Sequence, residues 1–155
     1  MRNQVDAGCD VIKLFDSWAG IVPKNKIIEY IITPTRDILN NLQDLQVKKI
    51  CFPKGIKDFE NEFLQLNFDI YALDFYTDIG MADQIFSKFG KITQGNFDPA
   101  FLLANNYDII RGEVDKIRAA TRNIPHIFNL GHGVLPETPV KNMEFLVEYY
   151  RESFL

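Results

Sequence analysis

The sequence lacks the features that mark secreted, membrane-spanning and nucleotide-binding proteins. Its only two cysteines, Cys9 and Cys51, have no metal-type spacing, and so few cysteines are typical of a reducing compartment. No apolar run approaches the ~20 residues of a membrane span, and residues 1–6 show no signal-peptide pattern. No phosphate-binding loop of the GxxxxGK[ST] type occurs. These absences predict a cytoplasmic protein.

The charge balance excludes two classes of partner. The chain has 17 basic and 21 acidic residues, a formal net charge of -4. A surface of that sign argues against a general binder of nucleic acid or of anionic membranes. The sequence contains no Gly/Ser-rich linker, low-complexity tract or fixed-period repeat, so we expect residues 1–155 to form a single domain.

What is present is a regular alternation of strand-like and helix-like segments. The predicted strands are residues 10–16, 48–53, 68–75, 92–97 and 125–130. Strands alternating with helices predict right-handed βαβ units and a parallel sheet. A doubly wound sheet could be complete at this length, whereas a (β/α)8 barrel needs about 250 residues, so five of its units would occupy roughly 156. Periodicity leaves both architectures open.

Four of the intervening or following segments have an apolar stripe at helical spacing. Two of these stripes are Met81, Ile85 and Phe89, and Ile110, Val114 and Ile117. We expect these residues to face the sheet, and we expect Gly90 to end the first helix in a left-handed conformation.

Polar residues at the carboxyl ends of parallel strands are the default functional candidates. His132 lies between two glycines just after a predicted strand. There it could serve as a proton donor or as a cation for carboxylates, or it could be an ordinary surface-loop histidine. His126 lies at the start of the same strand, so we expect it at the opposite end of the sheet with a structural role.

The first strand carries a second group of candidates. Alternation places Lys13, Phe15 and Ser17 on one side of it. Ser17 has no nucleophile-elbow context, and its hydroxyl is better suited to hydrogen bonding a carboxylate. The Lys13 ammonium is either a buried cation or snorkels to solvent, and we favour snorkelling.

Three carboxylates lie at or just after the ends of predicted strands: Asp74, Asp78 and Asp98. They could pair for acid/base chemistry or hold a hard metal. We favour helix capping, because Asp98 precedes a proline and Asp78 precedes the helix that contains Met81.

The strand-end segments, in their order along the chain, resemble those of the uroporphyrinogen decarboxylases. The matching segments are residues 15–20 (FDSWAG), 73–74 (LD), 94–99 (QGNFDP) and 128–139 (FNLGHGVLPETP), the last being the most specific. The resemblance extends from about residue 4 to residue 150. It implies the C-terminal part of a (β/α)8 barrel, with about five parallel strands and intervening helices.

The resemblance implies cofactor-free decarboxylation of the four acetate arms of uroporphyrinogen to coproporphyrinogen, in porphyrin and haem biosynthesis. Position by position, His132 and Ser17 match substrate-binding residues of the family, and Phe15 matches an apolar contact to the macrocycle. Gly95 and Asn96 match residues that shape the cleft. No metal ligand is implied.

The family's central aspartate and its arginine-rich loop have no match here, so we expect no catalytic residue in this chain and no turnover by the chain alone. The resemblance leaves a homodimer or a complementary N-terminal half as expected partners.

Two other functions stay open. The chain could be a non-catalytic barrel fragment that acts only by pairing with a partner. It could also be a relative of the zinc-dependent methyltransferases, although the cysteines and His132 do not form a ligand set by their spacing.

Overall fold

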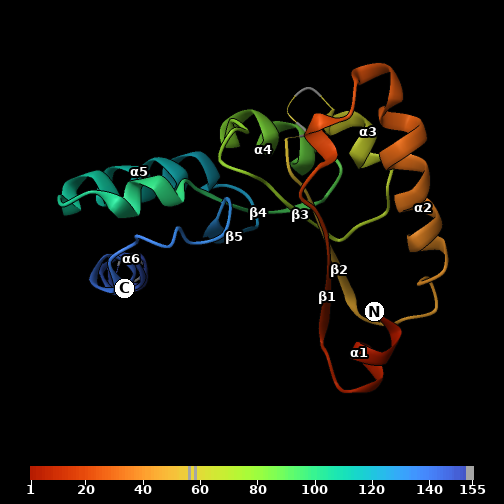
Figure 1. Ribbon diagram of the computed structural model, residues 1–155, viewed down its shortest axis with the longest axis horizontal. Coiled ribbons are helices and arrows are strands. Elements are labelled where there is room, and N and C mark those ends of the chain that lie inside the picture. Colours follow the sequence, from red (N-terminus) through yellow and green to blue (C-terminus); the bar gives the residue numbers. More distant parts are fainter. Residues whose placement is uncertain (56, 58, 153–155) are drawn as a thin grey trace.

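The computed structural model describes residues 1–55, 57 and 59–152, and it contains one five-stranded parallel sheet. The strands are β1 (Val11–Asp16), β2 (Lys48–Pro53), β3 (Ile70–Ala72), β4 (Ile92–Phe97) and β5 (His126–Leu130). Their order across the sheet is their order along the chain. Figure 1 shows the chain progressing from β1 and β2 on one side to β5 and the C-terminus on the other.

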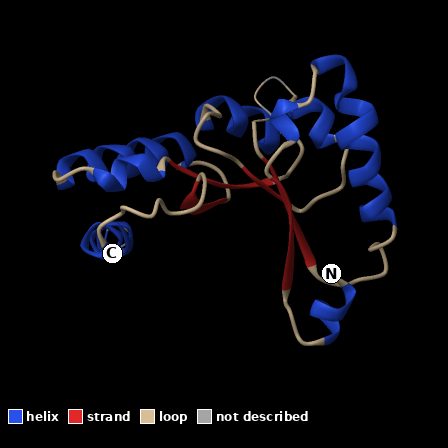
Figure 2. Ribbon diagram, viewed as in Figure 1, coloured by secondary structure: helices blue, strands red, loops and turns tan. Residues whose placement is uncertain are grey.

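Helices connect consecutive strands and cover the outer face of the sheet (Figure 2). The helices are α1 (Arg2–Asp6), α2 (Thr33–Asn40), α3 (Glu60–Leu64), α4 (Ile79–Ser87), α5 (Tyr107–Thr121) and α6 (Val140–Glu152). Shorter turns are η1 (Ala19–Ile21), η2 (Lys24–Lys26), the π-helical η3 (Ile28–Ile32) and η4 (Pro99–Leu103). A doubly wound sheet reverses its strand order and has helices on both faces. The observed order instead gives five consecutive units of a (β/α)8 barrel, as the resemblance implied.

The sheet curls strongly toward its inner face. On that face the Nζ atom of Lys13 in β1 donates a hydrogen bond of 2.7 Å to Oε1 of Gln94 in β4. A side-chain contact between strands that are not neighbours requires the concave side of a curved sheet. Ile50, Phe52 and Ile70 are buried together on this same side.

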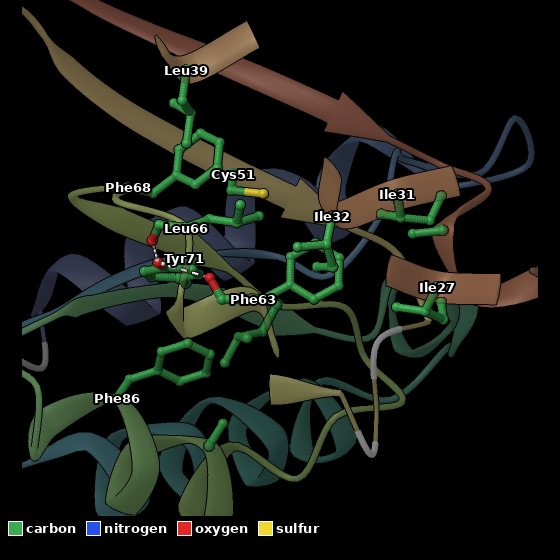
Figure 3. Packing of buried hydrophobic residues seen from close by; sticks show 13 residues of the cluster. Ile27, Ile31, Ile32, Leu39, Cys51, Phe63, Leu66, Phe68, Tyr71 and Phe86 are labelled. Atoms are coloured by element: carbon green, nitrogen blue, oxygen red, sulfur yellow. Dashed lines mark hydrogen bonds between the residues drawn. The ribbon is translucent and has the colours of Figure 1, made fainter. Parts of the chain in front are cut away.

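The main core lies between the outer face and the helices (Figure 3). Tyr71 of β3 is fully buried in it, and its ring lies 4.8 Å from that of Phe86. The Tyr71 hydroxyl donates to the carbonyl oxygens of Phe63, at 3.1 Å, and Leu66. Burial raises the pKa of Tyr71 well above its ordinary value, and the two acceptors keep its proton hydrogen bonded.

A second core holds α5 and α6 against β4 and β5. Ile110, Val114 and Ile117 are all buried there, which confirms the predicted stripe of α5. The predicted stripe of α4 is wrong: Met81 and Phe89 are 64% and 62% exposed.

The inner side of α4 is made instead by Ile79, Ala82 and Phe86. Gly90 has φ +64° just after this helix, so the left-handed stop is confirmed. Within the described part of the chain, no helix combines the length and apolar character needed to cross a membrane.

Candidate functional site

The loops at the carboxyl edge of the sheet are held together by the buried carboxylate of Asp74, which follows β3. Asp74 is 1% exposed and accepts hydrogen bonds from the backbone N–H of Gly55, Tyr76 and Thr77. It also accepts one of 2.9 Å from the Thr77 hydroxyl. One side chain thus joins the loop after β2 to the turn after β3. These bonds also explain why the predicted strand 68–75 ends early, at Ala72.

Close backbone approaches at this edge require glycine. A Cβ at Gly131 would lie 2.5 Å from the backbone nitrogen of Phe75 and 2.9 Å from the Asn96 carbonyl oxygen. The chain after β5 therefore packs directly on the loops after β3 and β4. This contact fixes the position of the backbone from which the His132 side chain extends. The His132 ring lies 6.5 Å from the Phe75 ring in an edge-on arrangement.

The predicted substrate-binding residues line one cavity on the concave side of the sheet. The cavity measures about 360 Å³. Its walls are Lys13, Phe15, Ser17, Phe52, Asn129, Leu130, His132, Gly133 and Val134. Phe15 and Ser17 come from the end of β1, and His132 comes from the loop after β5. The curl of the sheet brings the end of β1 and the loop after β5 to the same cavity.

The wall of the cavity made by β1 and β2 combines two aromatic rings with a cation. Phe15 is 62% exposed and packs edge-on against Phe52 at 5.7 Å. The Lys13 ammonium lies 4.8 Å from the Phe15 ring centre and 5.3 Å from that of Phe52. Lys13 therefore turns into the concave side and does not snorkel to bulk solvent. Burial lowers the pKa of Lys13, while the neighbouring Cys51 raises it to a lesser extent.

Gly95 and Asn96 lie outside this cavity's lining among the described residues. The Asn96 amide is buried, and its Nδ2 atom donates to the carbonyl oxygens of Asp74 and Thr77, at 2.9 and 2.7 Å. Its role in the structure is to hold the loop after β3.

His126 begins β5 and is held against the neighbouring strand β4 by Thr93 and Gly95. Its Nδ1 atom lies 2.8 Å from the Thr93 hydroxyl and its Nε2 atom 2.7 Å from the Gly95 carbonyl oxygen. Desolvation lowers the pKa of His126, and the bond to Gly95 opposes this in part. These bonds agree with the structural role expected for His126, which begins β5.

Two of the three strand-end carboxylates cap the element that follows. Asp78 accepts from the backbone N–H of Gly80 and Met81, at 2.9 and 3.1 Å, and Asp98 accepts from Ala100 at 2.9 Å. The preference for capping is confirmed for both. Among the residues that the structure describes, no group of three or more His, Cys, Asp or Glu side chains is arranged to hold a metal ion.

The family model that describes uroporphyrinogen decarboxylase matches residues 1–153. Two similar proteins are named uroporphyrinogen decarboxylase. The one from Orientia tsutsugamushi is 38% identical over 151 residues, and the one from Rickettsia massiliae is 41% identical over 152. Each alignment covers 96% of this chain but only 44% and 43% of the relative. The chain thus spans less than half the length of the relatives it matches.

Among solved structures, a methyltransferase from Methanosarcina mazei has a similar fold. The TM-score is 0.80 at 18% identity, and the match covers 97% of this chain and 44% of the methyltransferase. At that identity the similarity concerns the fold alone.

Proposed function

The chain belongs to the uroporphyrinogen decarboxylase family, and we propose that it supplies one side of a site that decarboxylates uroporphyrinogen to coproporphyrinogen. The observation that carries the proposal is the cavity that Phe15, Ser17 and His132 share. In this proposal residues 1–155 act as one incomplete barrel, and the rest of the site comes from sequence equivalent to the unmatched part of the relatives.

The reaction needs no redox partner. Protonation of an electron-rich pyrrole ring gives a cation that accepts the electron pair of the breaking bond as an acetate arm loses carbon dioxide. A proton then adds to the arm carbon that lost the carboxylate, and the ring releases the proton that it had gained, which restores the neutral pyrrole. The protein has to bind a macrocycle with eight carboxylates and stabilise the positive charge that develops on the ring.

The cavity residues suit different parts of such a ligand. The exposed ring of Phe15 offers an apolar surface for the macrocycle. The Ser17 hydroxyl and the His132 imidazole can each donate a hydrogen bond to a carboxylate. We assign these three residues to substrate binding, and we assign the chain no catalytic acid of its own.

A second candidate is a fragment that acts only by pairing with another chain, either a complementary half or a second copy. It is favoured by the positions of the arginines. Arg2, Arg36, Arg111, Arg118 and Arg151 lie in helices, and Arg122 follows α5. Within the described residues the cavity has no arginine to grip a polyanion. We propose that the protein acts in the cytoplasm under either function.

The test is anaerobic decarboxylation of freshly reduced uroporphyrinogen. The purified chain is assayed alone and mixed with the part of the Rickettsia massiliae relative that lies outside the match. We expect coproporphyrinogen only from the mixture. His132→Ala and Ser17→Ala should each lower the mixture's activity by about 10-fold or more, the usual effect of losing a hydrogen bond to a charged group.

Ser87→Ala, at the exposed end of α4, is the matched control for Ser17→Ala and should leave the activity unchanged. Absence of product from a folded mixture would contradict the decarboxylase proposal and favour the pairing function. Product from the chain alone would show that the unmatched part is dispensable.

A further inference from the structure

Lys13 is a cation in an unusual place, on the concave side of the curled sheet. Its side chain is partly buried, and its ammonium lies against the faces of two aromatic rings. An ammonium has three N–H donors and no acceptor. The described contacts give it one conventional hydrogen bond, to the neutral Oε1 of Gln94 at 2.7 Å. Since cation–π contacts replace only part of the lost hydration, this charge is incompletely compensated.

The electrostatic setting of Lys13 differs from that of the lysines that form ion pairs. Lys26, Lys48 and Lys116 each form an ion pair with a carboxylate at the surface. Within the described residues, no carboxylate is ion-paired with Lys13. A desolvated cation without a counter-ion gains most from an anion that enters its cavity.

The position of Lys13 in the proposed site indicates which anion could reach it. Lys13 lines the same cavity as Ser17 and His132, on the strand that also carries Phe15. A ligand that lays a ring on Phe15 and a carboxylate near Ser17 brings further carboxylates within reach of the cavity wall. The chain as a whole is acidic, so this local cation marks where a polyanion can be accepted.

We infer that Lys13 binds a carboxylate of the substrate, held in position by Gln94 and by the rings of Phe15 and Phe52. The inference rests on the proposed function, because the anion it assigns is an arm of the porphyrinogen. Gln94 is a positioning residue in this arrangement: its amide oxygen accepts one N–H and leaves the others free to turn toward the ligand.

A purely structural role makes a different prediction. If Lys13 only braces β1 against β4, its hydrogen bond to Gln94 matters and its charge does not. Lys13→Gln keeps a donor for Gln94 and removes the charge. Lys13→Met removes both, and Lys13→Arg keeps both. Lys91→Met is the control. Lys91, which directly precedes β4, is also partly buried, but its ammonium donates to Asn67 and Phe68.

Binding of uroporphyrin, the stable oxidised octacarboxylate, is measured by fluorescence titration on the same mixture of the chain and the unmatched part of the relative. We expect Lys13→Gln and Lys13→Met to weaken binding by about 10-fold or more. Lys13→Arg should stay within about 3-fold of wild type, and Lys91→Met should be unchanged. Circular dichroism checks that each variant is folded.

Coproporphyrin, which keeps four carboxylates and has no acetate arms, identifies the arm. If Lys13→Met weakens only uroporphyrin binding, Lys13 binds an acetate arm; if it weakens both, Lys13 binds a propionate. Wild-type affinity in folded Lys13→Gln would overturn the inference and leave the proposed function standing. No uroporphyrin binding by the wild-type mixture would overturn both.

Discussion

At the scale of single residues, Asp74 is the side chain on which the site's loops depend most. It is buried and accepts four hydrogen bonds from two loops. Asp74→Asn replaces part of that acceptor with a donor and leaves buried N–H groups unpaired. We expect a loss of roughly 2–3 kcal/mol in the free energy of unfolding, measured by urea denaturation.

Asp98→Asn is the matched control for this substitution. Asp98 accepts a single bond at the start of η4, and asparagine caps such starts about as well as aspartate. The control should change stability by less than about 0.5 kcal/mol. Equal losses in the two variants would mean that the hydrogen bonds of Asp74 contribute no more to stability than a single capping bond.

His126 makes stability depend on pH. Because burial lowers its pKa in the folded chain, the unfolded chain binds a proton first as pH falls. The free energy of unfolding should therefore be greatest well above the ordinary histidine pKa of about 6.5 and should decrease as pH drops below it. Urea denaturation between pH 8 and pH 5.5 measures this dependence.

The chain's two histidines give this prediction its own control. His132 is exposed, and the described residues give it no hydrogen bond to lose, so His132→Ala should keep the pH dependence. His126→Gln should flatten the curve while lowering stability at every pH. An unchanged slope in His126→Gln would assign the effect to other groups.

At the scale of elements, the loop after β1 packs directly against the loop after β2. A Cβ at Gly20, in η1, would lie 2.6 Å from the Gly55 Cα atom, and Gly55 itself has φ +78°. We expect Gly20→Ala to destabilise the fold by roughly 1–3 kcal/mol, since backbone would have to shift. Thermal unfolding measures the change.

Gly112 provides the opposite case within α5. A Cβ there would meet no atom within 4 Å, so Gly112→Ala should stabilise the protein by roughly 0.5–1 kcal/mol through helix propensity. A destabilised Gly112→Ala, or a neutral Gly20→Ala, would contradict the packing described for these elements.

The elements also show what the sequence can and cannot predict. The bounds of β2 and β4 are predicted correctly, with Gly55 shortly after β2 and with Gly90 and Pro99 on the two sides of β4. The end of β3 is missed, because the turn there is made by long-range bonds from Asp74 to the loop after β2. The inner side of α4 is missed because its apolar residues occupy two sides, and only the position of the sheet selects between them.

For the candidate site, strand alternation and the strand-end rule predict that Phe15, Ser17 and His132 face one region. Those rules need only local order and parallel pairing. The bond between Lys13 and Gln94 could not be predicted in this way, because it depends on how far the sheet curls.

At the scale of the whole molecule, the sheet has two open edges. Among the described strands, β1 pairs only with β2, and β5 pairs only with β4. The concave side between them presents the ring of Phe15, which is 62% exposed, and Trp18 in the loop after β1 is 70% exposed. Unpaired strand edges beside apolar surface favour pairing with another chain. We therefore expect the purified chain alone to self-associate as its concentration rises.

A charge on an edge strand should oppose this association, because pairing would bury the charge. Val11 begins β1 and is 40% exposed, so Val11→Lys should lower the apparent mass measured by sedimentation. Val140→Lys is the matched control, the same change at a 72% exposed valine at the start of α6.

If both variants associate like wild type, the β1 edge is not the contact. If both dissociate, net charge explains the effect. A response confined to Val11→Lys would assign the association to the open edge, where a complementary chain would also have to pair.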